Sequence, residues 1–350
     1  MNILRSLLRK SFPVFCALVV SIPIWAGSPD DAWKAYYDGD FPKALELARP
    51  LAESGEASTE FLMGLLYADG NAVEQSHEEA ARWYQKAVQK RYAPAQHNLG
   101  LMYLEGRGVP KDEAEGVKLI TFSAASGIPH AQFSLGVIFL EGNGVLKNEP
   151  KGAEWLEKAA NAGLAKAQTK YAELLITGTG VDEDAREAGR YFREAARQGD
   201  VRAMFGLGRL FRRGKWPVEP DREEALRWYR RAVEMGYAPA QTELGIMLAE
   251  PDLPDSDPVE AARLFQLGAD QGNAVAQNNL ALLYLRGEGV PQSDAKAFEL
   301  FTSAAMQGFP VAMEKLGNMY ENGRGTLPDL GEAYFWYKSS ERISFRDRGT

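Results

Sequence analysis

Apolar residues recur at the spacing of one helical face in the stretch that begins at residue 93. Ala95, Leu99 and Tyr103 follow one another at intervals of four, and a second amphipathic run comes after a glycine-rich gap. Residues four apart share a face of an α-helix, so each run predicts a helix and the gap predicts a tight connection. The predicted unit is a helical hairpin.

Near-copies of this stretch follow one another along most of the chain. When the copies are aligned on a Leu-Gly pair and its equivalents, the second positions fall in register at a spacing of 36 residues that one single-residue insertion breaks: Gly64, Gly100, Gly136, Ala172, Gly208, Gly245, Ala281 and Gly317. A repeat of this period is typical of solenoids. No alternating strand pattern competes, so the chain is predicted to be all-α.

The predicted loops and helix starts carry their own signals. Paired loop glycines recur where the backbone needs positive φ after the first helix ends: Gly106/Gly108, Gly142/Gly144, Gly178/Gly180, Gly287/Gly289 and Gly323/Gly325. In six copies the second helix begins with a polar cap and a glutamate three residues later, as in a capping box: Ser76/Glu79, Asp112/Glu115, Asp184/Glu187, Asp221/Glu224, Asp257/Glu260 and Asp329/Glu332.

These residues resemble the Sel-1-like repeat, a relative of the tetratricopeptide repeat. Its pattern, A-x-A-x-x-x-L-G-x-x-Y-x-x-G-x-G-V followed by K-A-x-x-W and A-A-x-x-G, covers roughly residues 57 to 341, with aromatic and closing positions at Trp83, Trp155, Trp228, Trp336, Gly127, Gly163, Gly199, Gly236, Gly272 and Gly308. The resemblance implies a right-handed α-solenoid of helix-turn-helix repeats that acts as a scaffold or adaptor. It indicates no enzyme activity and no cofactor.

Departures from the pattern are local. Arg91 replaces one closing glycine, Trp216 replaces the second loop glycine of the fifth repeat, and the loop of the sixth repeat, EPDLPDSD, has no glycine. We expect only the shape of these loops to change.

The register also predicts the domain organisation. A shorter hairpin over residues 28–56 forms an N-terminal cap, and a polar tail occupies 342–350. Between them lie eight repeats over 57–341: 57–92, 93–128, 129–164, 165–200, 201–237, 238–273, 274–309 and 310–341. An uninterrupted array of this kind predicts one elongated domain.

The first 26 residues do not belong to the array. A basic start is followed by an apolar run from Phe12 to Ala26, too short and too rich in proline to span a bilayer as a helix. This pattern predicts a secretory signal peptide cleaved after Ala26, and hence a periplasmic or secreted protein without membrane insertion. A retained anchor is the alternative; a lipoprotein is disfavoured because Phe15, not a small residue, precedes Cys16.

The net charge of the chain disfavours some classes of binding partner. The chain has a net charge of −8, and removal of residues 1–26 deletes three basic residues and no acid, which gives −11. An acidic protein is disfavoured as a binder of nucleic acid or of an anionic membrane surface. Cleavage also removes the one cysteine, so stability must come from helix stacking.

Candidate catalytic and metal-binding residues have simpler interpretations. His77, His97 and His130 form no close pair suited to a metal, and a structural role is favoured. Ser293 and Lys296 match the S-x-x-K motif of β-lactamases, but the partner motifs are absent and Ser293 stands at a helix-cap position. The G-x-G pairs lack the third glycine of a phosphate loop, and turn geometry accounts for them.

A surface is the remaining candidate site. In the family, the side of the first helix opposite the packed side lines the concave groove, and transfer of those positions gives an apolar part and a basic part: Phe61, Leu65, His97, Leu101, Phe133, Arg202, Phe205, Arg209, Arg212 and Arg213. The groove is therefore predicted to bind a protein segment with acidic and apolar residues. The alternatives are that the apolar residues pack against neighbouring hairpins and that the arginines are merely solvated.

The leading functional hypothesis is an exported adaptor in cell-envelope signalling, assembly or polysaccharide export. An exported factor that contacts a host or another cell is the second hypothesis. An envelope hydrolase or β-lactam-binding enzyme is a weak third, because it rests on Ser293 alone.

Overall fold

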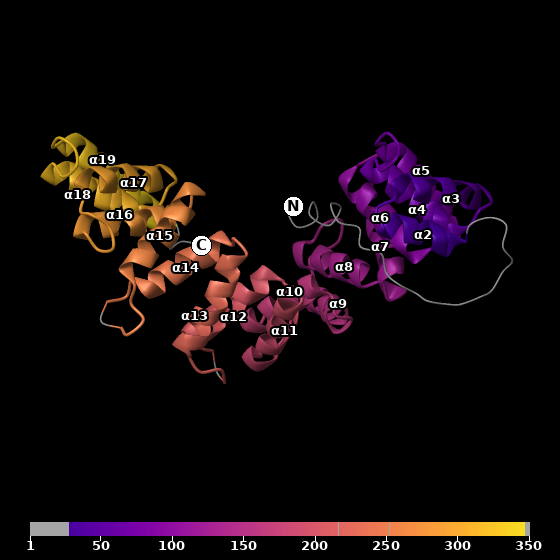
Figure 1. Cartoon of the computed structure of the whole chain (residues 1–350), viewed down its shortest axis with the longest axis horizontal. Coiled ribbons are helices and arrows are strands. Elements are labelled where there is room, and N and C mark those ends of the chain that lie inside the picture. The colour runs from indigo at the N-terminus through magenta and orange to yellow at the C-terminus, as the bar shows by residue number, and fades with distance from the viewer. Residues whose placement is uncertain (1–27, 216, 252, 347–350) are drawn as a thin grey trace. The chain divides into compact units, whose positions relative to one another are not determined.

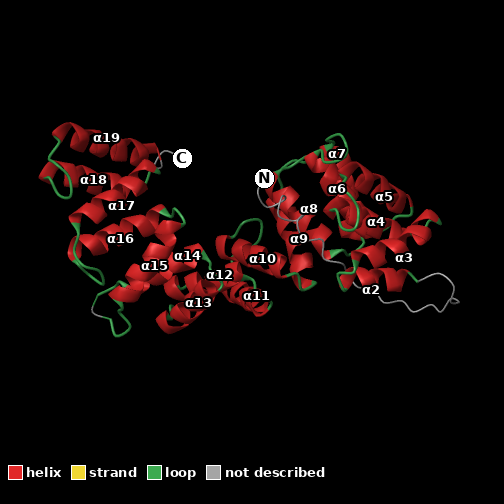
Figure 2. Cartoon of the chain, turned by 45° about the horizontal axis from the view of Figure 1, so that its top comes forward, coloured by secondary structure: helices red, strands yellow, loops and turns green. Residues whose placement is uncertain are grey.

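The computed structural model describes residues 28–215, 217–251 and 253–346 (Figure 1). These residues form helices joined by short loops, with one isolated β-bridge between Lys215 and Val218 (Figure 2). The helices pair into a cap hairpin and eight repeat hairpins, so the predicted all-α solenoid fold is confirmed. The predicted signal peptide and Trp216 lie outside the described residues.

Within each hairpin, a first helix is followed by a second. The first helices are α2 (Pro29–Tyr37), α4 (Ala57–Asp69), α6 (Ala93–Glu105), α8 (Pro129–Glu141), α10 (Ala165–Thr177), α12 (Val201–Arg213), α14 (Ala238–Leu248), α16 (Ala274–Arg286) and α18 (Pro310–Asn322). The second helices are α3 (Phe41–Glu53), α5 (His77–Gln89), α7 (Glu113–Ala125), α9 (Glu149–Asn161), α11 (Ala185–Arg197), α13 (Arg222–Glu234), α15 (Pro258–Asp270), α17 (Asp294–Met306) and α19 (Leu330–Arg346). The first helices of all eight repeats begin at the first residue of the predicted repeat.

The chain forms two compact units, one up to Ala195 and one from Ala196, and the boundary falls inside α11. The core of the first unit contains fully buried Tyr84, Leu135 and Ile138. That of the second contains Tyr229, Phe265 and Phe301. No helix of the described residues is both long enough and apolar enough to cross a membrane.

The second helices begin at the predicted caps, but only half of each predicted capping box forms. In all six, the cap side chain accepts the N–H of the glutamate at 2.9 to 3.2 Å. The cap's own N–H donates instead to a carbonyl of the preceding first helix, as from Ser76 to Tyr67 and from Asp112 to Tyr103. Five glutamates are thereby left to pair with a cation one turn later: Glu79–Arg82, Glu115–Lys118, Glu187–Arg190, Glu224–Arg227 and Glu260–Arg263.

The paired loop glycines all have positive φ, as predicted. The second of each pair also touches the start of the preceding repeat's second helix. A Cβ on Gly108 would lie 2.2 Å from the carbonyl oxygen of His77, and one on Gly289 would lie 2.0 Å from that of Pro258. Glycine is thus required there because two backbones meet. Arg91, which replaces a closing glycine, keeps a φ of 60° and so preserves the turn.

Buried glutamines join successive repeats. The side-chain amide at the fourth position of a first helix donates to a carbonyl near the end of the preceding second helix: Gln132 to Ala124 at 3.3 Å, Gln168 to Ala160 at 3.3 Å and Gln277 to Ala269 at 3.4 Å. The last carbonyls of a helix have no partner inside it. Here the N–H of the closing glycine supplies one, at 2.9 to 3.0 Å from Gly127, Gly163 and Gly272, and the glutamine of the following repeat adds a second.

The C-terminal helix is longer than the sequence predicts. α19 continues to Arg346, five residues into the predicted polar tail. Ile343 packs on the cluster around Phe301 and Leu316, so an apolar contact supports the additional turn.

Candidate functional site

The apolar part of the predicted site lies inside the protein. Phe61, Leu65, Leu101 and Phe133 are at most 6% exposed. The Phe61 ring packs against Trp33, Tyr84 and Tyr92, with centroids 6.0, 5.5 and 5.5 Å away. These residues therefore do not line an open surface. They pack between hairpins, which is the alternative that the sequence left open.

The reason is that first helices are covered on several sides. In α6 the buried residues extend round most of the helix: Ala95, Gln96, His97, Leu99, Gly100, Leu101 and Met102. The periodicity of one hairpin reveals the face that packs on its own second helix. It does not reveal the face that the next repeat covers.

His97 is likewise part of the packing. Its Nε2 lies 3.0 Å from the hydroxyl of Ser134, which belongs to the next repeat. Burial, together with the nearby His130, lowers the pKa of His97 to about 3. The imidazole is therefore neutral at physiological pH and offers no charge to an acidic partner.

Three of the predicted arginines lie together on α12. Arg202, Arg209 and Arg213 are exposed, and none forms an ion pair within the part of the chain that the structure describes. Their spacing of seven and four residues puts them in line on one side of the helix, over about 16 Å. We call Arg202, Arg209 and Arg213 the arginine stripe.

The surroundings of the arginine stripe combine aromatic and basic character. Phe205, on the same helix, is half-buried against Tyr229 and Tyr237, with ring centroids 5.8 and 5.4 Å away. Repeat 201–237 contains nine Lys or Arg and five Asp or Glu, although the chain as a whole has a net charge of −8. Unpaired guanidinium groups beside an aromatic ring can bind carboxylates and apolar side chains.

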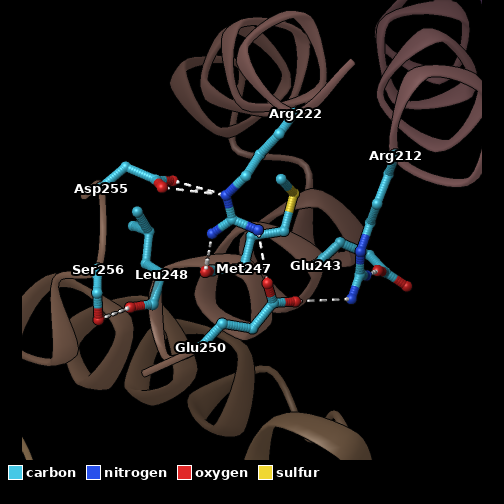
Figure 3. Close-up of polar contacts among 8 residues, drawn as sticks. All are labelled: Arg212, Arg222, Glu243, Met247, Leu248, Glu250, Asp255 and Ser256. Carbon is cyan, nitrogen blue, oxygen red and sulfur yellow. Dashed lines mark hydrogen bonds and ion pairs between the residues drawn. The ribbon is translucent and has the colours of Figure 1, made fainter. Parts of the chain in front are cut away.

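Arg212 does not belong to the arginine stripe, because it pairs with acidic residues of the next repeat (Figure 3). Its guanidinium pairs with Glu243 and, at 3.7 Å, with Glu250, and its side chain is only 25% exposed. Glu250 is shared with Arg222, whose Nη1 lies 2.6 Å from it. We therefore assign Arg212 a structural role, in place of the predicted role in partner binding.

Arg222 is the centre of this network. It also contacts Asp255, at 3.0 Å from Nε, and donates to the carbonyl oxygen of Met247 at 2.6 Å. The hydrogen bond from Arg222 holds the pKa of Asp255 below its ordinary value. Because α14 ends at Leu248 without a glycine cap, Arg222 both satisfies a terminal carbonyl and holds the glycine-free loop.

Sequence reasoning missed the acidic members of this network. Glu243, Glu250 and Asp255 lie 28 to 38 residues from their arginines, in the next repeat. The available signal was the loop of the sixth repeat, which has acidic residues where other loops have glycine.

Ser293 is a helix cap, as predicted. Its hydroxyl accepts the N–H of Lys296 at 3.3 Å. The Lys296 amino group lies instead over the Tyr284 ring, 5.0 Å from its centroid. Among the described residues, no group of three His, Cys, Asp or Glu is placed to hold a metal ion.

Comparisons with known proteins agree with this architecture. The Sel1 repeat family model matches residues 57–92, 93–128, 129–164, 165–200, 201–237, 238–273, 274–309 and 310–341. No curated protein matches the chain.

Two solved structures illustrate the similarity. A Sel1 repeat protein from Oxalobacter formigenes is 31% identical, with 70% of this chain and 100% of that chain covered and a TM-score of 0.62. The protein c5321, a protective antigen of uropathogenic Escherichia coli strains, is 26% identical, with 93% and 88% covered and a TM-score of 0.38.

Proposed function

The chain belongs to the Sel1 repeat family, and from this premise we propose that it is an exported adaptor that binds an acidic, partly apolar segment of a protein partner. Sel1 repeat proteins generally mediate protein–protein interactions. The cell envelope is the proposed place of action, in signalling, assembly or polysaccharide export.

The arginine stripe is the observation that carries this proposal. Three exposed cations stand in line on one helix of an acidic protein without acidic partners in the described chain, and together they can attract a ligand rich in carboxylates. A stripe of about 16 Å matches roughly five residues of extended chain. Phe205 adds an apolar contact beside it, so a segment with both acidic and aromatic residues fits best.

Charge reversal in the arginine stripe should weaken the binding of an acidic polypeptide. Labelled poly-L-glutamate and a random glutamate–tyrosine copolymer are suitable probes, with fluorescence anisotropy at low salt as the measurement. We expect Arg209→Glu/Arg213→Glu to weaken binding of both at least about tenfold, because charged contacts decide such an encounter. If Phe205 contributes, the copolymer binds the unmodified protein more tightly than polyglutamate does.

The matched control is Arg227→Glu/Arg263→Glu, which changes the net charge equally. Arg227 and Arg263 are 55% and 56% exposed and pair with glutamates of their own helices. Equal loss of binding in the two variants would show a general charge effect and contradict the proposed site. Binding of single-stranded DNA in preference to polyglutamate would contradict the class of partner.

Export is tested by the mass of the protein that reaches the envelope. We expect a mature chain that begins at Gly27, because residues 1–26 have the basic start, short apolar run and small residue of a cleaved leader. A mass that retains Met1–Ala26 would contradict this. Cell fractionation separates the two settings: envelope retention supports the adaptor, and release into the medium supports a factor that contacts a host.

A further inference from the structure

The hydroxyl group of Tyr229 is buried without a hydrogen-bond partner. Tyr229 lies in α13, is 0% exposed and packs beside Phe205. Among the residues that the structure describes, none forms a hydrogen bond with its hydroxyl oxygen. Nearly all buried polar atoms of folded proteins have such a partner, and an atom that lacks one lowers the stability of the fold. This hydroxyl therefore calls for an explanation.

The other repeats show that the fold does not need this hydroxyl. The position eight residues after the helix cap has a side chain without a hydroxyl group in five repeats: Ile120, Leu156, Phe192, Phe265 and Phe301. The two other tyrosines at this position both have partners. Asn98 Nδ2 donates to the hydroxyl of Tyr84 at 3.3 Å, and the hydroxyl of Tyr337 donates to Glu321 at 2.8 Å. The ring of Tyr229 fills the core as a phenylalanine ring does, and this packing requires no oxygen atom.

The hydroxyl of Tyr229 lies next to the arginine stripe. A Cβ on Gly208 of α12 would be 2.5 Å from two carbons of the Tyr229 ring and 2.9 Å from the carbon that bears the hydroxyl. The tip of the ring therefore lies against the turn of α12 that continues from Gly208 into Arg209. The charged side chains that act on the hydroxyl are Arg209, Arg212, Arg213 and Glu243. Two of these four belong to the arginine stripe.

The hydroxyl lacks an acceptor for its proton. Glu243 stands at the sixth residue of α14, as Asn98 stands at the sixth residue of α6, but its carboxylate pairs with Arg212. Burial and the nearby Glu243 raise the pKa of Tyr229 more than the arginines lower it, so the hydroxyl keeps its proton. Arginine side chains only donate hydrogen bonds. A ligand with an anionic oxygen would supply the missing acceptor.

We propose that Tyr229 donates a hydrogen bond to the carboxylate that Arg209 and Arg213 bind, and that it thereby fixes the position of this carboxylate at the arginine stripe. The inference rests on the proposed function, because it concerns the same acidic segment. A carboxylate reaches the buried hydroxyl only after a side chain above it moves. Arg209 and Arg213 are exposed, and no acid of the described chain holds them, so both are free to move with the ligand. The bound carboxylate then has two charge-assisted contacts and one directional contact that charge alone does not provide.

Tyr229→Phe tests the proposal without a change of charge. The probe is again labelled poly-L-glutamate, and its affinity is measured by fluorescence anisotropy over a range of salt concentrations. We expect the variant to bind the probe at least about fivefold more weakly, because a hydrogen bond to a charged group is lost. The dependence of affinity on salt should stay the same, because both arginines remain in place. A variant that had disturbed the arginine stripe would change that dependence as well.

The matched control is Tyr84→Phe, which removes the hydroxyl from the same position of the first repeat. This hydroxyl already has Asn98 as its partner, so binding of the probe should be unchanged. Thermal unfolding gives a second comparison. Tyr229→Phe should be at least as stable as the unmodified chain, whereas Tyr84→Phe should be less stable, because only the latter loses a hydrogen bond within the protein.

The outcomes separate this inference from the proposed function. If Tyr229→Phe binds the probe normally while Arg209→Glu/Arg213→Glu binds it more weakly, the inference is overturned and the proposed function stands. If the unmodified chain does not bind the probe, or if neither variant alters binding, both are overturned. A Tyr229→Phe chain that is less stable but binds normally would show that the hydroxyl serves the fold alone, which also overturns the inference.

Discussion

Replacing Gly289 with alanine is expected to destabilise the second unit by about 3 kcal/mol or more. The added Cβ would lie 2.0 Å from the carbonyl oxygen of Pro258 and 2.3 Å from its carbon, so the loop and the start of α15 would have to separate. The φ of 68° adds the strain of a left-handed backbone for an alanine. Both effects act on a contact between neighbouring repeats, and neighbouring contacts hold a solenoid together.

Gly272 provides a control that separates the two effects. It has a φ of 80°, but a Cβ there would meet nothing within 4 Å. Gly272→Ala should therefore cost only about 1 to 2 kcal/mol, from the backbone strain alone. Urea unfolding followed by circular dichroism measures both variants. Equal losses of stability would show that the close contact of the two backbones does not contribute to the difference between the variants.

A charged residue in place of Leu135 should destabilise the first unit at least as much as Gly289→Ala destabilises the second. Leu135 is 0% exposed in α8. Leu135→Asp removes a buried leucine, worth about 2 to 5 kcal/mol, and adds the cost of a carboxyl group in an apolar site. We expect most of the stability of the first unit to be lost.

Thermal unfolding compares this variant with Leu146→Asp. Leu146 is 92% exposed in the loop that follows α8, so the same substitution there should change stability by no more than about 0.5 kcal/mol. An unchanged melting temperature for Leu135→Asp would mean that this position is not in the core.

The boundaries of the helices could be predicted from the sequence because they depend on local chemistry. The first helices of the repeats begin at Ala57, Ala93 and the equivalent later residues, as the register predicts. The caps form at Ser76 and its equivalents because a short polar side chain can accept a nearby N–H. Each of these signals spans only a few residues.

The candidate site could be predicted only in part, because exposure depends on neighbouring repeats. The sequence pattern assigns Phe61 to an open side of its helix, yet Trp33 of the cap hairpin and the tyrosines of its own repeat surround it. Arg212 and Arg213 are consecutive in the sequence, but Glu243 of the next repeat pairs with Arg212 alone. The arginine stripe is unpaired because no described acidic residue reaches it.

Because of the glutamine hydrogen bonds between repeats, a structural unit of this protein does not end at the residue where a repeat of the sequence ends. A piece of chain that stops at residue 128, where the matched repeat ends, leaves the carbonyl of Ala124 with the N–H of Gly127 alone and without the amide of Gln132. A piece that continues through the first turn of α8 retains that hydrogen bond, worth about 1 kcal/mol. A fragment of this array should therefore end after the first turn of the next first helix, and not at the last residue of the sequence repeat.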